Sequence, residues 1–480
     1  MSAARLPVED RWPLLIAPLA LLGLLGMAAV GTPAELLTAA AFGTVLVVGG
    51  LCLTAFIDVA WLFSGALALT VFAGNWGQIG LPGMVSLDRL LLVVAIVVFL
   101  LRDPALGRRP YVRLTPAHVV LGLAAAYALC STVAAGTIGD AAALAPLLDR
   151  FGVIPFLLFL IAPAAFASEH QRRILLGTLM AVGAYLGLVA FFEGIGLNAL
   201  VFPRYIVELN PEVQAGRARG PFAAAAVNGV ALYFCAVACA VAYATMPKPW
   251  TRRLALAIGA LCLFSLIFTQ ERSVWVGAIA ATVIACLLAP PLRAKLVFGA
   301  IAAAVALAAA FVLVPDLQQS TGERIGEKQT EWERLNMNHA AVDMVLDKPL
   351  LGFGLGTFKE NSEPHFQLNP DYPLSATDTE LHNLFLSYAV ELGLVGVTLW
   401  VVGFALAIGG AILVRGPPEL YPWRIGLIAI ALMWLVVAGL VPMVQPFPNY
   451  LLWLWAGVVW PWRYAWSAEE GAGDERAINR

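Results

Sequence analysis

The chain has 480 residues, of which 61% are hydrophobic and only 12% are charged, and its mean hydropathy is +0.83. Soluble domains carry roughly 25% charged residues, so this composition excludes an ordinary soluble enzyme. The net charge of −2 excludes the basic field that recruits nucleic acid. Apolar runs recur between Leu14 and Trp460, and many approach the roughly 20 residues that a helix needs to cross a bilayer. The sequence therefore predicts an all-α polytopic membrane protein.

The first part of the chain begins with a polar stretch. Residues 1–11 include two arginines, and the apolar run from Leu14 to Val30 follows without a small-residue cleavage motif. We therefore expect a retained first helix rather than a cleaved signal. The remainder of residues 14–101 is mostly apolar, and at about 20 residues per span this stretch fits four helices better than two.

Beyond residue 113, the hydrophobic runs predict ten more helices. We place them at 115–135, 150–167, 173–192, 221–245, 253–269, 273–289, 295–315, 383–413, 424–444 and 447–463. With the N-terminal helices included, we expect about 12–14 membrane spans.

The polar segments between these helices predict the orientation. Short cytoplasmic loops retain Lys and Arg, and basic segments recur one helical hairpin apart, at residues 5–11, 102–113, 172–173, 248–253, 293–295, 415–424 and from 463 onward. We assign these segments and both termini to the cytoplasm. The chain then divides into N-terminal transmembrane helices (1–192), a first extended external loop (193–220), central transmembrane helices (221–315), a large external loop (316–381), C-terminal transmembrane helices (382–465) and a cytoplasmic tail (466–480).

The large external loop is the longest polar block of the chain. It contains 12 of the 31 acidic residues and five basic ones, a bias typical of an exported segment. Residues 331–346 are predicted to form an amphipathic helix at the membrane surface, because Trp332, Leu335, His339, Val342 and Leu346 recur at helical spacing. Such a helix could cap the bundle or line a substrate site. The glycine-rich run 352–358 follows no strand and is predicted to be a loop.

Six arginines fall on the external side outside this loop, where the charge bias disfavours them: Arg89, Arg150, Arg204, Arg217, Arg219 and Arg272. Arg272 lies in a short polar segment between two predicted apolar helices. It could form an ion pair with Glu271 or another acid, or extend its charge to the membrane interface. Alternatively, Arg219 and Arg272 could converge on an anionic substrate group, because guanidinium groups bind phosphates in a bidentate manner.

His382 stands directly before an apolar run, where the chain re-enters the membrane. A histidine there can be neutral near pH 7 and can accept a proton from a hydroxyl. The alternative is a histidine that caps or hydrogen-bonds the helix. Asp378, Glu380 and His382 could also bind a divalent cation, but no second cluster of ligands supports such a site. We expect neither a metal nor a cofactor.

Three segments together resemble a known family. Residues 381–396, LHNLFLSYAVELGLVG, resemble the signature HN…L…E.G..G of the O-antigen ligase and polymerase superfamily. Residues 332–354 are similar to its lead-in W…A…P..G.G, and Arg219-Gly220-Pro221-Phe222 with Asn228 is similar to its earlier arginine element. Glu271-Arg272 matches a position usually occupied by Ser-Arg, so the serine is missing here. The resemblance covers about residues 217–400.

The resemblance implies a GT-C-like membrane glycosyltransferase at the periplasmic side of a bacterial inner membrane. The donor would be a glycan on undecaprenyl diphosphate, and for a ligase the acceptor would be a lipid A-core sugar hydroxyl. Transfer would be metal-independent and would invert the anomeric centre. His382 would be the catalytic base, and Arg219 and Arg272 would bind the donor diphosphate. Arg217, which matches no motif of the family, is a further candidate for the diphosphate site. Asn383, Glu391, Asn228 and His339 are secondary site residues.

Other functions remain open from the sequence. A polymerase of O-antigen or exopolysaccharide, or a protein O-oligosaccharyltransferase, would share the signature and the donor and differ only in the acceptor. A lipid-glycan flippase or other transporter is a different class. Transporters place ionisable residues near the bilayer midplane. Asp58 is the main candidate for such a residue here, and the remaining charges cluster at the predicted membrane faces, so we favour glycan transfer.

Overall fold

The computed structural model describes residues 58–80, 86–105, 114–209, 216–289, 328–367, 381–414 and 416–460. Within these ranges every regular element is a helix. Seven helical segments are long and apolar enough to cross a membrane: Pro116–Ala134, Ala143–Ala165, Glu169–Gly194, Ala225–Thr245, Pro249–Thr269, Leu384–Leu413 and Pro418–Ala438. The prediction of an all-α polytopic membrane protein is therefore confirmed. The helices expected within residues 14–57 and 295–315 lie outside the described residues, so the expected 12–14 spans remain a prediction.

The longer helices of the bundle, in chain order, are α3 (Val59–Leu69), α4 (Leu87–Ala105), α5 (Pro116–Ala134), α7 (Val153–Ala165), α8 (Glu169–Gly194), α10 (Ala225–Thr245), α11 (Pro249–Ser265), α12 (Arg272–Leu288), α15 (Lys328–Asp347), α17 (Leu384–Phe404), α19 (Tyr421–Ala438) and α20 (Pro446–Val459). Each helix predicted between residues 115 and 289 or after 382 overlaps one of these. The short elements that matter below are α6 (Ala141–Ala145), the π-helix η4 (Pro146–Phe151), α9 (Tyr205–Glu208), the 3-10 helices η6 (Gly220–Phe222) and η7 (Leu266–Thr269), and α16 (Phe358–Ser362).

The core of the bundle forms around α10 and α20, whose side chains are almost all buried. Helix α10 packs against α8, α11 and α19, and α20 packs against α7 and α19. Large aromatic side chains fill the space near α20: Trp400, Phe404 and Trp434 stack on one another, and Trp453 meets Phe404 edge to face. Such pairs add to the stability that burial alone provides.

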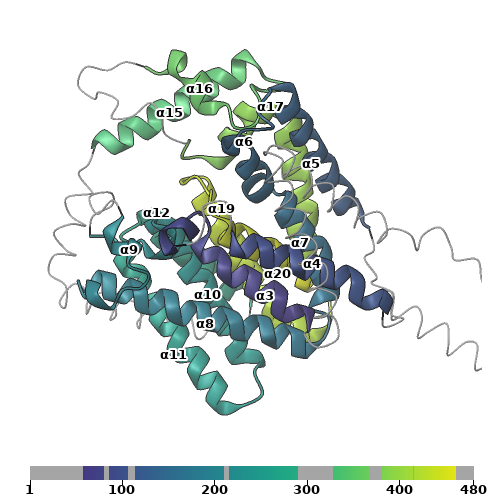
Figure 1. Ribbon diagram of the computed structural model, residues 1–480, viewed down its shortest axis with the longest axis vertical. Coiled ribbons are helices and arrows are strands. Elements are labelled where there is room, and N and C mark those ends of the chain that lie inside the picture. Colours follow the sequence, from purple (N-terminus) through teal and green to yellow (C-terminus); the bar gives the residue numbers. More distant parts are fainter. Residues whose placement is uncertain are drawn as a thin grey trace, which may run out of the picture.

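Helices α15, α16 and α6 lie at one end of the molecule, beside the neighbouring ends of α5 and α17 (Figure 1). Helix α15 packs on α16 and α17. The described part of the large loop is therefore a small helical layer that covers the beginning of α17, where His382 lies.

Helix α15 confirms the helix predicted at 331–346, but the side that faces the protein is a different one. The buried residues are Asn336, Met337, Ala340, Ala341 and Met344. Three members of the predicted apolar stripe, Leu335, Val342 and Leu346, are exposed. The helix thus has an apolar edge against α16 and α17 and a second apolar edge that points away from the protein. The large apolar residues of the outer edge made its helical spacing easy to recognise in the sequence. The alanines and methionines of the inner edge did not mark it as the buried side.

Candidate functional site

Two segments that resemble the family lie side by side. The backbone N–H of Ala218 donates to the carbonyl of Phe268 (2.8 Å), and the Gln270 side chain donates to the carbonyl of Gly216 (2.9 Å). Asn228, fully buried in the first turn of α10, donates to the carbonyl of Ala218 (3.1 Å). These bonds hold residues 216–220 against the end of η7, and they bring Arg217 close to the Glu271-Arg272 pair.

Arg217 and Glu271 form a half-buried hydrogen-bonded ion pair. Arg334, on α15, and Arg272 also lie close enough to lower the pKa of Glu271. Burial outweighs these three cations, so that the pKa of Glu271 lies above its ordinary value. We call Arg217, Glu271, Arg272 and Arg334 the arginine cluster. With Glu271 ionised it carries three positive charges against one negative charge, and Arg272 and Arg334 are exposed. The cluster therefore suits a multiply charged anion.

Arg219 is more deeply placed than the cluster, with only 6% of its surface exposed. Its guanidinium Nη2 donates to the carbonyls of Ile206 (2.9 Å), within α9, and of Leu209 (3.1 Å), which follows α9. The carboxylate of Glu193 accepts from the backbone N–H groups of Arg219 (3.1 Å) and Gly220 (2.9 Å). Arg219 thus ties α9 to the segment that bears Arg217.

Helix α15 connects the arginine cluster with the segment that contains His382. Arg334 lies one turn before Met337, and Met337, Ala341 and Met344 pack with Leu381, the residue before His382. At 1.5 Å per residue, Arg334 and Met337 are about 4.5 Å apart along the helix axis. His382 is partly exposed, and it immediately precedes the N-cap of α17.

Asn383 begins α17 as its N-cap. Its side-chain oxygen accepts from the backbone N–H groups of Phe385 (3.1 Å) and Leu386 (3.2 Å), which would otherwise lack partners at a helix start. This cap fixes the point at which the chain turns into α17, and hence the position of His382. Asn383 therefore acts as a helix cap, a role that the sequence pattern alone did not assign to it.

Helix α17 is broken at Gly393, whose φ of 64° and ψ of −176° are not helical. The glycine-rich loop fills the break: Phe353 and Gly354 donate to the carbonyls of Val390 (2.9 Å) and Glu391 (2.8 Å). On the other side of the break, the N–H of Leu394 donates to the carbonyl of Pro349 (2.8 Å). Irregular backbone inside a membrane protein persists where the protein satisfies its polar groups. The predicted loop is thus a docked segment.

Glycine is required on both sides of this contact. A Cβ on Gly393 would lie 2.2 Å from the carbonyl oxygen of Leu350, and one on Gly352 would lie 2.5 Å from the carbonyl oxygen of Val390. Both residues also have positive φ, which favours glycine. The glycines of the family-like signature and of its lead-in therefore meet each other in space.

A cavity of about 200 Å³ lies beside this break, between α16, η4 and the first two turns of α17. Its polar residues are Arg150, Lys359, Ser387 and Glu391. Arg150 and Glu391 are both buried, and Arg150 Nη2 is 3.8 Å from Glu391 Oε2. Leu381 also lines the cavity, so its wall ends next to His382.

Arg150 is held by the π-helical turn η4, a rare geometry that is frequent at functional sites. The carbonyl of Arg150 accepts from Tyr388 Oη (2.7 Å), and that of Phe151 accepts from Trp400 Nε1 (2.9 Å). The preceding residue, Asp149, contacts Arg89 (2.6 Å) and Tyr450 Oη (2.5 Å) instead. These bonds anchor η4 to α4, α17 and α20.

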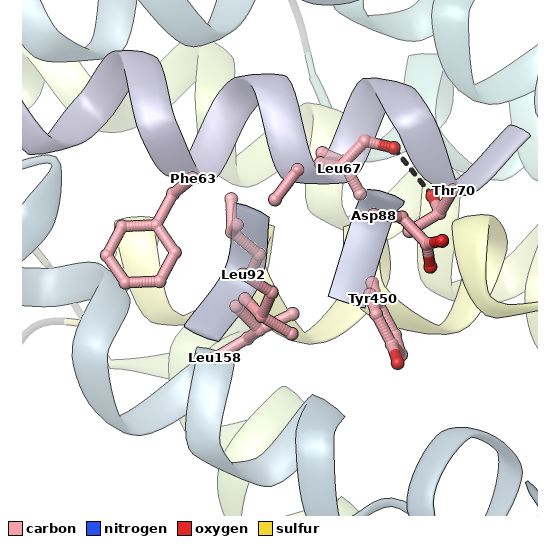
Figure 2. Close-up of a pocket in the computed structure, with 9 residues that line it drawn as sticks. Phe63, Leu67, Thr70, Asp88, Leu92, Leu158 and Tyr450 are labelled. Atoms are coloured by element: carbon pink, nitrogen blue, oxygen red, sulfur yellow. Dashed lines mark hydrogen bonds between the residues drawn. The ribbon is translucent and has the colours of Figure 1, made fainter. Parts of the chain in front are cut away.

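A second and much smaller cavity, of about 10 Å³, is lined in part by Tyr450, one of the residues that anchor η4. Figure 2 shows Asp88, Thr70 and Tyr450 at one end of it and Phe63 at the other. Asp88 accepts from Trp76 Nε1 (2.6 Å). This space is too small for a substrate, and we regard its polar residues as part of the anchor of η4.

The structure brings together some predicted site residues and separates others. Arg217 and Arg272 share the arginine cluster. Arg219 and Asn228 hold the segment that bears Arg217. Asn383 caps α17 directly after His382, and Glu391 lies within α17. His339 is exposed on α15. Asp378 and Glu380 lie outside the described residues.

Four residues had no role assigned from the sequence: Arg150, Arg334, Lys359 and Ser387. Arg150 had a usable signal, a charged residue at the edge of an apolar run. The other three had none.

The O-antigen ligase family model, Wzy_C, matches residues 257–401. The chain therefore contains an O-antigen ligase domain, as the resemblance predicted. Members of this family are membrane glycosyltransferases that act on lipid-linked glycans. The match contains Glu271, Arg272, α15, His382 and the break in α17, whereas Arg150, Arg217 and Arg219 precede it. A search of curated proteins finds no match.

Proposed function

We propose that this protein is an O-antigen ligase. It transfers a glycan from undecaprenyl diphosphate to a sugar hydroxyl of lipid A-core, at the periplasmic face of a bacterial inner membrane. The observation that carries the proposal is the link made by α15, which joins a cation-rich cluster to the segment bearing His382 within an O-antigen ligase domain. Glycan transfer from a lipid diphosphate needs these two features, a cationic leaving-group site and a base, close together.

The arginine cluster binds the donor diphosphate in this proposal. When the bond between the anomeric carbon and the diphosphate breaks, negative charge develops on the departing oxygen. Arg217, Arg272 and Arg334 stabilise that charge more than they stabilise the intact donor, which is how a fixed cation lowers a barrier. Guanidinium groups suit this task because they stay charged at all relevant pH values and bind phosphate with two parallel hydrogen bonds.

Arg219 supports the diphosphate site mainly by position. Its Nη2 group already serves two carbonyls, and its backbone N–H is held by Glu193. It fixes the turn that presents Arg217, and it adds a nearby positive charge. This role differs from that of Arg272, which is exposed.

His382 is the base in this proposal. Neutral imidazole accepts the proton of the acceptor hydroxyl while the oxygen attacks the anomeric carbon and the diphosphate leaves with the bonding electron pair. A single displacement of this kind inverts the anomeric centre. The position of His382 is fixed by the Asn383 cap behind it and by the packing of Leu381 under α15.

A reconstitution experiment tests the proposal. Purified protein in lipid vesicles is given undecaprenyl-diphosphate glycan with EDTA, and with one of three acceptors: lipid A-core, a second undecaprenyl-diphosphate glycan, or a folded periplasmic protein. Transfer to lipid A-core alone, with inverted linkage by NMR, is expected. Transfer to the second lipid-linked glycan instead would identify a polymerase, and transfer to protein would identify a protein O-oligosaccharyltransferase. No transfer, with movement of the lipid-linked glycan across the bilayer, would identify a flippase.

A further inference from the structure

The cavity at the break in α17 is separate from the arginine cluster and has its own polar character. Its walls come from η4, α16 and α17, whereas the cluster comes from residue 217, the start of α12 and the first turns of α15. The cavity carries two cations, Arg150 and Lys359, and one carboxylate, Glu391. With all three ionised, its net charge is +1. A cavity of this charge favours an anionic ligand over a neutral one.

The arrangement of Arg150 and Glu391 suits a hydroxyl group. Their charged atoms are 3.8 Å apart, beyond the 2.7–3.2 Å of a direct N–H···O hydrogen bond. A hydroxyl oxygen at their edge can accept from the guanidinium and donate to the carboxylate. The Ser387 hydroxyl, one turn before Glu391 on α17, adds a further donor and acceptor. The cavity is therefore built for a polyhydroxylated ligand with an acidic group.

The geometry of η4 indicates that this cavity is constructed rather than a packing defect. Tyr388 and Trp400 hold consecutive carbonyls of the π-helical turn, and Gly356 lets the loop approach Ala143 so closely that a Cβ would lie 2.7 Å from its Cα. Keeping an arginine and a glutamate buried costs desolvation energy. Hydrophobic residues of similar size would fill the space at lower cost, so stability alone does not account for the charges.

We propose that this cavity binds one anionic sugar unit of the acceptor, a monosaccharide that carries a phosphate or a carboxylate group. This inference rests on the proposed function. A base must contact the acceptor whose hydroxyl it deprotonates, and the cavity wall ends at Leu381, next to His382. The cavity, of about 200 Å³, has room for a sugar ring rather than for an oligosaccharide. The donor diphosphate occupies the arginine cluster, so the two substrates approach His382 from different elements.

Direct binding to purified protein without donor tests the inference. The probes are glucose 6-phosphate, glucuronate and glucose, measured by equilibrium dialysis against protein in detergent. We expect both anionic sugars to bind about tenfold more tightly than glucose, the effect of one charge-assisted contact. The better of the two identifies the acidic group as phosphate or carboxylate. Equal binding of all three sugars would overturn the proposal.

Lys359→Gln provides the site-specific arm, since Lys359 is exposed and its replacement is not expected to affect folding. We expect it to weaken binding of the anionic sugars about fivefold and to leave glucose unchanged. Ser387→Ala is expected to weaken all three. Lys348→Gln is the matched control, because Lys348 lies in the same loop but over the Phe353 ring, outside the cavity. If Lys348→Gln weakened binding as much as Lys359→Gln, the cavity would not be the binding site.

Kinetics then separates this inference from the proposed function. In the reconstituted assay, Lys359→Gln should raise the acceptor KM about fivefold and leave the donor KM unchanged. A higher donor KM, or competition of the sugars with donor, would refute the acceptor assignment while leaving glycan transfer intact. Absence of transfer to any acceptor would refute the proposed function, and the dialysis would still decide whether the cavity binds anionic sugars.

Discussion

The arginine cluster and the Arg150–Glu391 cavity both place arginine next to glutamate, but they differ in how completely the charges are balanced. In the cluster, three arginines surround one glutamate, and two of them are exposed. In the cavity, one buried arginine faces one buried glutamate. Excess charge is tolerable at a wet surface, where solvation and screening are strong, whereas a buried charge requires a partner. The first arrangement suits capture of a diphosphate, and the second suits recognition of hydroxyl groups beside a single acidic group.

His382 follows Leu381, which packs against α15 and lines the cavity. As the proposed base, His382 should have the largest effect when it is lost. We expect His382→Ala to reduce transfer by about 10²–10⁴-fold, the usual contribution of a general base, with little change in either KM. Single-turnover kinetics with saturating donor measures this. His339→Ala, which alters an exposed histidine of α15, is the matched control. Full activity of His382→Ala would remove the proposed base.

Glu391→Ala should reveal how strictly the buried pair is balanced. The substitution leaves Arg150 buried without this carboxylate, and breaking such a pair costs about 3–5 kcal/mol. We expect a lower Tm in a detergent thermal-unfolding assay. Glu208→Ala, which removes the partner of an exposed i,i+4 pair with Arg204, should change stability by less than about 0.5 kcal/mol. Equal effects from the two variants would contradict the contrast between buried and exposed pairs.

Arg272→Ala should act on the donor rather than on stability. Hydrogen bonds to charged groups contribute about 1.5–3 kcal/mol, so the donor KM or the transfer rate should worsen by about 10–100-fold. Arg219→Ala is expected to lower both activity and Tm, because Arg219 also donates to two carbonyls in and directly after α9. If Arg272→Ala left donor affinity and rate unchanged, the diphosphate would bind elsewhere.

The smallest expected effect is a pH dependence at Glu271. Burial raises the pKa of Glu271 in the folded protein, so the folded state holds this proton more tightly than the unfolded state does. The resulting contribution of Glu271 to the free energy of unfolding is full below the ordinary glutamate pKa and is lost as pH rises through the raised pKa. Over the same range Glu271 gains its negative charge and offsets one arginine. Donor affinity of the wild type should therefore fall with rising pH, by less than about tenfold.

The Glu271→Gln variant supplies the comparison for this pH series. It should bind donor with an affinity that varies less with pH, because the amide does not titrate. Donor binding by the two proteins, measured from pH 4 to pH 8 in the same buffers, gives a ratio from which the other titrating groups cancel. A ratio that stays constant with pH would show that Glu271 does not titrate in this range.

Most helices could be predicted from the sequence, because an apolar run long enough to span a bilayer is stable there as a helix. The runs predicted at 221–245 and 273–289 correspond to Ala225–Thr245 and Arg272–Leu288. The arginine element and Glu271-Arg272 were also recognisable, since charges at the ends of apolar runs are rare and therefore conspicuous. The break in α17 at Gly393 was not predicted, because its partner, the loop at residues 349–354, lies about 40 residues earlier in the chain.

By itself, the sequence determined that this is a helical membrane protein with an O-antigen ligase signature. It also identified a small set of arginines on the side predicted to be external, where the charge bias disfavours them. Only the tertiary structure decided which arginines share a site, which face of α15 is buried and where Arg150 points. The reason is physical. Hydrophobic periodicity and charge position are local properties that hold for each segment alone, whereas an ion pair such as Arg150 with Glu391 exists only after helices far apart in the chain have packed.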